Sequence, residues 1–312
     1  MKIAYFLPAH ELSNQELVKE FPEWTAEKIF AKTGISSRPI ASENETALDL
    51  GEQAAKRLFC KYNIDPSSIN FLVLCTQSSL YPLPSTACLL QARLGLPNTC
   101  GAITIDQGCS GYVYGLSIAK GLLNSGLVKN VLLVTAETYS KYLAKDDKST
   151  RAIFGDGATA TFLDEADGKA IGAFSFGTDG SGAEKLIVRD GHLFMDGPEI
   201  FNFTLDIVPK TLDAVLAANG MTRKDVDLYV FHQANKFMLD TIRKVNQLPQ
   251  ERFYVNLETT GNTVSSTIPL ALAQLEATGQ LRAGMQIVLL GFGVGLSWAA
   301  TVIQWNENQE IV

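Results

Sequence analysis

Short runs of apolar and β-branched residues alternate along the chain with longer stretches whose apolar positions recur every three or four residues. The short runs predict buried strands, and the longer period is that of helices with one apolar face. This alternation is typical of an α/β protein built from layers of sheet and helix. We expect strands at residues 70–75, 131–137, 158–163, 226–231, 286–292 and 297–305. We expect helices at residues 47–62, 85–94, 111–125, 204–219 and 235–246.

A polar segment, Asp-Glu-Ala-Asp-Gly at residues 164–168, interrupts this alternation near the middle of the chain and is typical of a turn. It predicts an N-terminal half over residues 1–165 and a C-terminal half over residues 166–312. Each half contains a glycine-rich stretch near its end, at residues 154–157 and 291–295. These stretches suggest an ancient duplication, although the two halves are too different in sequence to establish it.

Composition and charge narrow the range of partners. The chain of 312 residues, with 46% hydrophobic and 19% charged residues, resembles an ordinary globular protein with a large core. Its net charge of -7 argues against binding to nucleic acid or to an anionic membrane, because a polyanion requires a basic face. No apolar run approaches the roughly 18 residues of a membrane span, and the N-terminus lacks the pattern of a signal peptide. We therefore expect a cytoplasmic protein.

Five cysteines without a Cys-x-x-Cys pair favour neither a disulfide framework nor a zinc ribbon. Cys109 differs from the others because it lies between an apolar run and the predicted helix at 111–125, with Gly108 and Gly111 beside it. A thiol at a helix start lies at the positive end of the helix dipole, where its pKa is expected to fall. Cys109 is therefore either a nucleophile or a small buried apolar side chain.

Two other polar residues occupy positions suited to chemistry. His232 directly follows the predicted strand at 226–231, and the carboxyl ends of strands are where open α/β sheets bind ligands. A histidine there can also serve only as a structural hydrogen-bonding group. Asn262 precedes a helical run at 268–275, so its side chain either caps that helix or donates to a developing oxyanion.

The glycine-rich stretch at 291–295 is followed by a predicted strand and not by a helix. A nicotinamide nucleotide site needs a phosphate-binding helix at that place, so this kind of site is excluded. A tight turn that presents a backbone N–H fits the stretch better.

Taken in order, these motifs resemble the β-ketoacyl-acyl-carrier-protein synthase III family of the thiolase-like superfamily. The resemblance covers nearly the whole chain and runs through Phe6-Leu-Pro8, Leu12-Ser-Asn14, Lys32-Thr-Gly-Ile35, Arg38, Cys109-Ser-Gly-Tyr112, Phe154-Gly-Asp-Gly-Ala158, His232-Gln-Ala-Asn235, Gly261-Asn-Thr263 and Gly291-Phe-Gly-Val-Gly295. It implies a five-layered αβαβα fold with two similar halves, usually assembled as a homodimer. It also implies a decarboxylative Claisen condensation that needs no metal and no bound cofactor.

The resemblance also assigns roles to individual residues. Cys109 would accept an acyl group from a coenzyme A or carrier-protein thioester, and the backbone N–H groups of Cys109 and Val294 would bind the first oxyanion. His232 and Asn262 would stabilise the enolate that forms when a malonyl group on an acyl carrier protein loses carbon dioxide. Leu83 would limit the chain length of the acyl group from across the dimer, leaving room for chains longer than acetyl.

Several positions depart from the family pattern at the site for the acyl donor. Lys28 replaces a tryptophan that stacks on the adenine of coenzyme A, and Trp24 lies one helical turn away. Lys32 and Lys148 replace two arginines near the nucleotide phosphates, with Arg151 close by. Lysine keeps the charge but loses stacking and bidentate recognition of phosphate. These changes favour a carrier protein over coenzyme A as the donor.

The predicted helix after His232 supplies a basic face for an acidic carrier protein. Lys236, Arg243 and Lys244 recur at helical spacing, and an ordinary solvated face is the alternative. Phe237, Ile242 and Val245 are expected to point into the core.

Two other functions are possible on the same fold. The protein could be an acyltransferase that passes the acyl group to an oxygen or nitrogen nucleophile, or it could have no catalytic activity. The presence of Asn262 argues against the acyltransferase. The presence of Cys109, His232 and Asn262 together argues against a protein without catalytic activity.

Overall fold

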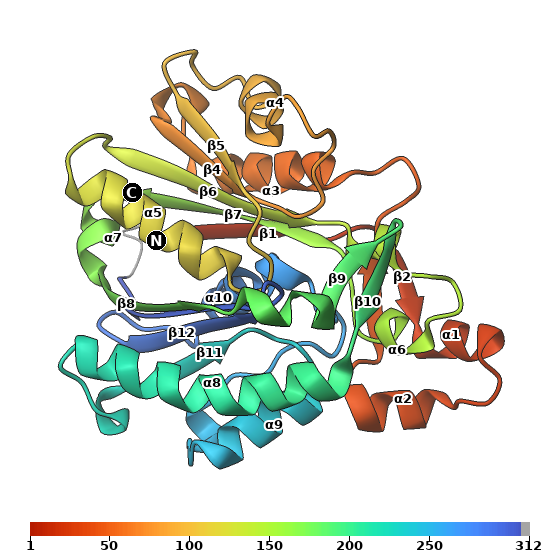
Figure 1. Ribbon diagram of the computed structural model, residues 1–312. Coiled ribbons are helices and arrows are strands. Elements are labelled where there is room, and N and C mark those ends of the chain that lie inside the picture. The colour runs from red at the N-terminus through yellow and green to blue at the C-terminus, as the bar shows by residue number, and fades with distance from the viewer. Residues whose placement is uncertain (307–312) are drawn as a thin grey trace.

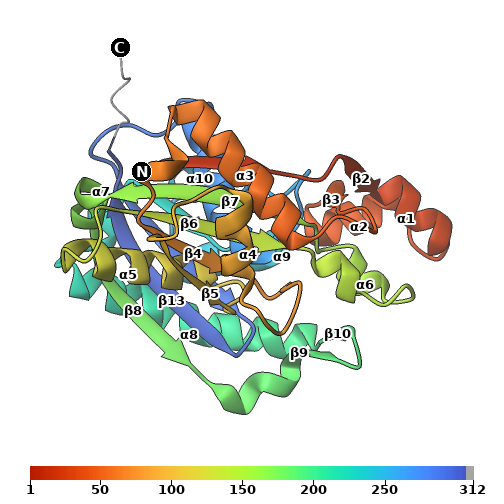
Figure 2. The same ribbon diagram turned by 90° about the horizontal axis from the view of Figure 1, so that it is seen from above.

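Two sheets form the body of the protein in the computed structural model, which describes residues 1–306 (Figure 1, Figure 2). The first sheet has the strand order β1-β7-β6-β4-β5 and the second has the order β11-β12-β13-β8. The strands of the first sheet are β1 (Lys2–Phe6), β4 (Phe71–Cys75), β5 (Gly101–Ile105), β6 (Asn130–Glu137) and β7 (Gly157–Asp164). Those of the second are β8 (Ile171–Thr178), β11 (Leu228–Phe231), β12 (Gln286–Gly293) and β13 (Ser297–Gln304).

Helices cover both sheets and also fill the space between them (Figure 1). The outer face of the first sheet carries α3 (Ala47–Tyr62) and α4 (Thr86–Arg93), and the outer face of the second carries α8 (Gly197–Ala218) and α9 (Lys236–Val245). The middle layer consists of α5 (Gly111–Asn124) and α10 (Thr267–Ala277), whose apolar residues pack against both sheets. The expected five layers are therefore confirmed.

The strands are apolar on both faces because each sheet lies between two helix layers. In β6, Leu132 and Val134 pack in the cluster that contains α3, whereas Val131 and Leu133 pack in the cluster that contains α5. Successive side chains of a strand point to opposite faces, so both sets are buried. This arrangement explains the uninterrupted apolar runs of the sequence.

The two sheets repeat one order of pairing. In the first, β1 and β7 pair antiparallel, β7 and β6 pair antiparallel, and β6 and β4 pair parallel. In the second, β8 and β13 pair antiparallel, β13 and β12 pair antiparallel, and β12 and β11 pair parallel. This repetition supports the suggested duplication. The boundary at residue 165 stays a prediction; the strands of the first sheet lie within residues 2–164 and those of the second within 171–304.

Helix caps explain two differences from the expected elements. Helix α8 begins at Gly197, before the expected start at 204, because the side chain of Asp196 accepts a hydrogen bond from Glu199 N and caps the helix. The segment at 164–168 was expected to be a turn, but it starts the short helix α7 (Glu165–Ala170). Its acidic residues form a capping box there, which satisfies the first N–H groups of α7.

The expectation that Phe237 and Val245 point into the core is wrong, because their residues are 62% and 51% exposed. Ile242 is buried, as expected. The buried stripe of α9 consists of Met238, Leu239 and Ile242, and residues 237 and 245 lie outside that stripe.

Smaller elements extend from one side of the body (Figure 1, Figure 2). They are α1 (Asn14–Glu20), α2 (Ala26–Thr33), α6 (Lys148–Arg151), the strand pair β2 (His10–Ser13) and β3 (Ser37–Ile40), and the strand pair β9 (Leu186–Arg189) and β10 (His192–Met195). None of the helices in residues 1–306 combines the length and the apolar character that crossing a membrane requires.

Candidate active site

Cys109 lies in the connection between β5 and the central helix α5, and the residue is only 6% exposed. Two glycines of β12 allow the second sheet to approach it closely. A Cβ atom added at Gly293 would lie 2.9 Å from both Cβ and Sγ of Cys109, and one added at Gly291 would lie 2.6 Å from its carbonyl oxygen. Any larger residue at these positions would displace the connection that holds the thiol.

Burial raises the pKa of the Cys109 thiol to about 12, with a smaller contribution from the carboxylate of Glu137. The backbone N–H groups of Val294 and of Cys109 itself act in the opposite direction, because they donate to the sulfur. The expectation of a lowered thiol pKa is therefore wrong, since the loss of water around the sulfur outweighs the helix start. The same two N–H groups therefore lie next to the Cys109 sulfur, the atom that would carry an acyl group.

His232 follows β11 and is 2% exposed. Its Nδ1 lies 2.7 Å from the hydroxyl oxygen of Thr267, and its ring meets the ring of Phe292 edge to face. Burial lowers the pKa of His232 to about 3, so the ring is neutral at neutral pH. The Thr267 contact fixes the ring with Nε2 turned toward the Asn262 side chain.

Asn262 does not cap α10, whose N-cap residue is Ser266. Its side-chain oxygen instead accepts a hydrogen bond of 2.8 Å from Val264 N, which turns Nδ2 toward Nε2 of His232 at 3.4 Å. Its backbone is paired with the glycine-rich stretch of the first half, through Asn262 N to Ile153 O and Gly155 N to Asn262 O. Of the two roles left open by the sequence, helix capping is excluded.

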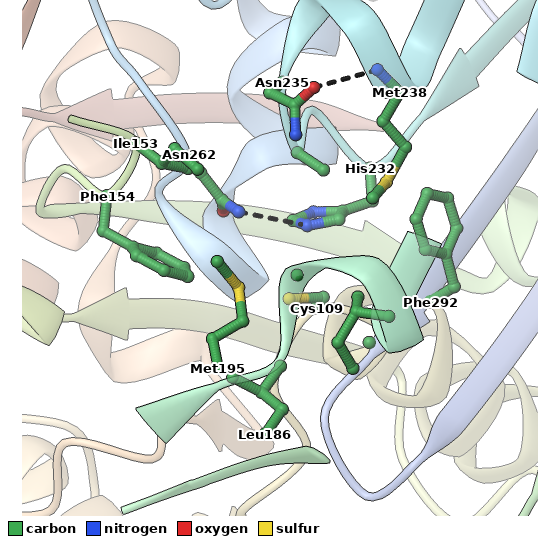
Figure 3. Close-up of a pocket in the computed structure, with 14 residues that line it drawn as sticks. Cys109, Ile153, Phe154, Leu186, Met195, His232, Asn235, Met238, Asn262 and Phe292 are labelled. Atoms are coloured by element: carbon green, nitrogen blue, oxygen red, sulfur yellow. Dashed lines mark hydrogen bonds between the residues drawn. The ribbon is translucent and has the colours of Figure 1, made fainter. Parts of the chain in front are cut away.

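The three side chains line one cavity of about 130 Å³, although they come from three separate segments (Figure 3). Cys109 lies opposite the facing nitrogens of His232 and Asn262, and the remaining wall is largely apolar (Figure 3). The apolar residues include Phe154, Leu186, Met195, Ile200, Met238 and Phe292. Residues 1–306 contain no cluster of three His, Cys, Asp or Glu side chains able to hold a metal ion.

Glu137 is a buried carboxyl group that the sequence analysis missed. It ends β6, is 0% exposed, and accepts hydrogen bonds from Ser265 Oγ, Ser78 Oγ and Gln77 N. Burial raises its pKa to about 8, while these donors act to lower it. Glu137 thereby ties the connection after β4 to the loop that carries Asn262. An acidic residue at the end of an otherwise apolar strand was the sequence feature that could have revealed it.

Leu83 and the basic residues lie away from this cavity. Leu83 is 82% exposed in the connection between β4 and α4, and it does not line the cavity that contains Cys109. Lys28 and Lys32 lie exposed on α2. The structure thus groups the predicted catalytic residues and leaves these three on the surface.

Four of the other predicted cations have partners, whereas Lys244 is exposed on α9 and makes no ion pair within residues 1–306. Lys148 binds Glu23 at 2.6 Å and lies over the ring of Trp24, while Arg151 makes two hydrogen bonds to the carboxylate of Glu20. On α9, Lys236 binds Asp240, and Arg243 donates to the carbonyl oxygen of Leu248.

Comparison with known protein families places most of the sheet and site residues in two matched regions. Residues 103–180 match the model described as 3-oxoacyl-[acyl-carrier-protein (ACP)] synthase III. Residues 216–305 match the model for the C-terminal part of the same proteins. Cys109 lies in the first region, and His232 and Asn262 lie in the second.

Individual proteins show the same similarity over the full length. The beta-ketoacyl-[acyl-carrier-protein] synthase III 2 of Halalkalibacterium halodurans is 34% identical, over 99% of this chain and 96% of its own. A solved 3-oxoacyl-(acyl-carrier-protein) synthase III structure matches with a TM-score of 0.94 and 47% identity, covering 97% of this chain and 98% of that chain. The priming beta-ketosynthase of the R1128 polyketide biosynthetic pathway matches with a TM-score of 0.91 and 30% identity, covering 98% and 95%.

Proposed function

The chain belongs to the 3-oxoacyl-[acyl-carrier-protein] synthase III family of condensing enzymes, and from this premise we propose that Cys109 carries the acyl group that is extended. The second substrate is malonyl-acyl-carrier protein, and the product is a 3-oxoacyl thioester for fatty-acid or polyketide biosynthesis. The observation that carries the proposal is the meeting of Cys109, His232 and Asn262 in one cavity.

In the first half-reaction, the sulfur of Cys109 attacks the carbonyl carbon of the acyl thioester. A new S–C bond forms, the donor's C–S bond breaks, and the thiol proton leaves with the donor as its free thiol. The N–H groups of Cys109 and Val294, which donate to the sulfur in the free protein, stabilise the oxyanion of the tetrahedral intermediate.

In the second half-reaction, the thioester oxygen of the malonyl group lies between His232 Nε2 and Asn262 Nδ2. The Thr267 hydroxyl lies within hydrogen-bond distance of both Val264 O, at 3.1 Å, and His232 Nδ1, at 2.7 Å. In the tautomer that the reaction uses, it donates to Nδ1, the proton of the neutral ring is on Nε2, and Nε2 and Asn262 Nδ2 both donate to one oxygen. Carbon dioxide leaves, and its electron pair forms the enolate that these donors stabilise. The enolate carbon attacks the acyl carbonyl carbon and forms the new C–C bond, the bond from that carbon to the Cys109 sulfur breaks, and the thiolate takes a proton from water.

The acyl donor in this proposal is a carrier protein. Lys148 and Arg151 hold the carboxylates of Glu23 and Glu20, so their charges are already neutralised where a nucleotide phosphate would need them. Lys148 also covers the ring of Trp24. Binding of coenzyme A at this place would have to break these contacts first.

The carrier protein docks on the surface formed by α2 and α9, which we call the α2–α9 surface and define by Lys28, Lys32, Phe237 and Lys244. The three lysines are exposed and make no ion pair within residues 1–306. Phe237 stacks on Phe201 with ring centroids 5.4 Å apart and supplies an apolar centre. Such a surface suits a partner with acidic residues around an apolar patch.

The protein works as a homodimer in this proposal, with β5 at the interface. Strand β5 lies at the edge of the first sheet, where its unpaired backbone groups can bond to a second copy. Ile103 on this strand is 36% exposed. Leu83 is 82% exposed and lies two residues before Ser85, whose hydroxyl is hydrogen-bonded to that of Thr104 in β5. Both apolar side chains would be covered by a partner. Leu83 would then reach the acyl pocket of the other subunit.

The test is to supply an acyl thioester together with malonyl-acyl-carrier protein and to identify the products by mass spectrometry. Condensation predicts one carbon dioxide released for each 3-oxoacyl carrier protein formed. Transfer of the acyl group to an oxygen or nitrogen acceptor without release of carbon dioxide would contradict the proposal and support the acyltransferase alternative.

A further inference from the structure

A second cavity, of about 310 Å³, adjoins the cavity of Cys109. The two share Leu186 in their walls, and the ring of Tyr139 in the second packs on the ring of Phe154 in the first, with centroids 5.5 Å apart. Val294 also borders the second cavity, and its N–H group is directed at the Cys109 sulfur. The second cavity therefore begins next to the position of a Cys109-bound acyl carbonyl.

Most of the second cavity is apolar, but one part of its wall is not. Ala183, Ile187, Val188 and Leu193 supply an apolar side, whereas Gln77, Tyr139 and Tyr142 supply polar groups. A cavity meant only for a hydrocarbon chain gains nothing from such groups, because polar groups that leave water must find partners. The polar part of the wall therefore points to a polar ligand.

Three polar groups of Gln77 make hydrogen bonds to neighbouring residues. Its backbone N–H donates to the carboxylate of Glu137, its backbone carbonyl oxygen accepts from the hydroxyl of Tyr142 at 3.1 Å, and its side-chain Oε1 accepts from the hydroxyl of Tyr139. A Cβ atom added at Gly108, the residue before Cys109, would lie 2.5 Å from Gln77 Oε1. The amide is thus fixed beside the loop of the nucleophile.

One polar atom of Gln77, the side-chain Nε2, makes no hydrogen bond within residues 1–306. Next to it, the Tyr139 hydroxyl gives its proton to Oε1 and keeps lone pairs on its oxygen. Tyr139 is buried, and burial raises its pKa well above the usual value, so the hydroxyl stays protonated. Gln77 is partly buried, and its Nε2 donor and the Tyr139 acceptor lie side by side with no partner within residues 1–306, an arrangement complementary to an alcohol group.

We propose that Gln77 and Tyr139 select an acyl group that bears a hydroxyl on its chain, so that the preferred primer is a short hydroxyacyl thioester. The hydroxyl oxygen accepts from Gln77 Nε2, and its proton is donated to the oxygen of Tyr139. This inference rests on the proposed function and adds to it the class of substrate. Gln77 and Tyr139 are specificity-determining residues here, and the chemistry stays with Cys109, His232 and Asn262.

The test compares matched thioesters of N-acetylcysteamine that differ only by a hydroxyl. Butyryl, (R)-3-hydroxybutyryl, (S)-3-hydroxybutyryl and 4-hydroxybutyryl groups are offered separately, and acylation of Cys109 is followed by intact-protein mass spectrometry. The wild-type protein is expected to react with one hydroxylated probe about tenfold faster than with butyryl, because that hydroxyl satisfies a donor which butyryl leaves unpaired.

Three variants decide whether the selectivity comes from this pair. Gln77→Met removes the donor at similar size, and its ratio of hydroxybutyryl to butyryl rates should fall to about one through slower reaction with the hydroxylated probe. Tyr139→Phe removes the clamp on the amide and should lower the ratio severalfold. Ile187→Val alters the apolar side of the same cavity and should leave the ratio unchanged, which makes it the matched control.

A wild-type ratio within twofold of one for every hydroxylated probe would overturn the inference. A clear preference that persists in both Gln77→Met and Tyr139→Phe would overturn it as well. Failure of the proposed function gives different results: no probe, butyryl included, acylates Cys109, or the acylated protein releases no carbon dioxide with malonyl-acyl-carrier protein. Acylation without discrimination contradicts only the role of Gln77 and Tyr139.

Discussion

The side-chain nitrogen of Asn262 faces Nε2 of His232 at 3.4 Å, although the residues are 30 positions apart in the chain. One loop sets this relationship. Val264 N holds the Asn262 oxygen, and Thr267 Oγ lies against His232 Nδ1, so residues 262–267 orient both side chains. With the ring proton on Nε2, these two neutral groups both donate and can stabilise a single developing oxyanion.

Asn262→Ala should slow decarboxylation of malonyl-acyl-carrier protein by about a hundredfold or more, because one of the two donors to the enolate oxygen is lost. Acylation of Cys109 uses other donors and should change by less than about fivefold. Carbon dioxide release and intact mass measure the two half-reactions separately. An equal loss in both would mean that Asn262 mainly holds the loop.

Thr267→Val provides a matched test of the histidine's orientation. It keeps the size of the side chain but removes the hydroxyl that lies 2.7 Å from Nδ1. Decarboxylation should again fall more than acylation, by about tenfold. If decarboxylation stays at the wild-type rate, the Thr267 contact does not position His232.

Glu137→Gln should make Cys109 easier to alkylate at high pH. The Glu137 carboxylate is one cause of the raised thiol pKa, so its removal lowers that pKa and raises the thiolate fraction. At pH 9 the variant should react with iodoacetamide about threefold to tenfold faster than wild type. At pH 6 the difference should vanish, because Glu137, with a pKa of about 8, is then uncharged in the wild type.

The same substitution should change the dependence of stability on pH. The pKa of Glu137 is higher in the folded protein than in the unfolded chain, so its contribution to stability is present at low pH and is lost as pH rises from about 4.5 to about 8. The melting temperature of Glu137→Gln relative to wild type should therefore increase over this range. A constant difference between pH 5 and pH 8 would show that the carboxyl group does not titrate in the folded protein.

The sequence alone predicted the layered fold because its strands and helices differ in apolar period. Strand β6 and helix α3 lie close to the expected ranges. The strand is buried on both faces and has an unbroken apolar run, whereas the helix is buried on one face and has apolar residues every three or four positions. Cap chemistry was harder to interpret: the acidic residues at 164–168 suit a turn and a helix start equally well, and only the surrounding structure selects the helix α7.

For the site, the sequence predicted three residues that the structure brings into one cavity, but it did not predict their environment. The pKa of Cys109 depends on how much water β12 excludes, which no local pattern contains. Glu137 and Gln77 were missed because their hydrogen bonds join segments about 60 residues or more apart. The partners of Lys148 and Arg151 are acidic residues more than 120 positions away, so their neutralised charges also could not be foreseen.

Reversing the charge of Lys28 and Lys32 should weaken docking of the acidic carrier protein. The double variant Lys28→Glu/Lys32→Glu is expected to raise the KM for malonyl-acyl-carrier protein about tenfold at low salt and less at high salt, because screening removes the steering charge. Acylation by small thioesters should not change. Reversal of Lys236 and Arg243, which bind Asp240 and the carbonyl oxygen of Leu248, is expected to have a smaller effect.

Lys129→Glu is the control for charge alone, since this exposed lysine lies just before β6 and belongs to neither α2 nor α9. It should leave the KM for the carrier protein within about twofold of wild type. Equal effects of Lys129→Glu and the α2 variant would show that net charge, and not the α2–α9 surface, governs binding.

Leu83→Phe should shorten the acyl chains that the protein accepts, because a larger side chain would fill part of the partner's pocket in the proposed dimer. Rates with acetyl, butyryl and hexanoyl thioesters give the profile, and sedimentation gives the state of assembly. The expected outcome is a dimer that keeps acetyl and loses most activity with hexanoyl. An unchanged profile in a dimer would remove Leu83 from the acyl pocket.

The most direct test of the central role of Cys109 is intact-protein mass spectrometry after exposure to an acyl thioester, followed by peptide mapping. The wild-type protein should gain the mass of one acyl group on Cys109, and addition of malonyl-acyl-carrier protein should return it to its starting mass. Cys109→Ala should gain no acyl group. An adduct on Cys60, Cys75, Cys88 or Cys100, or one that persists in Cys109→Ala, would contradict the assignment.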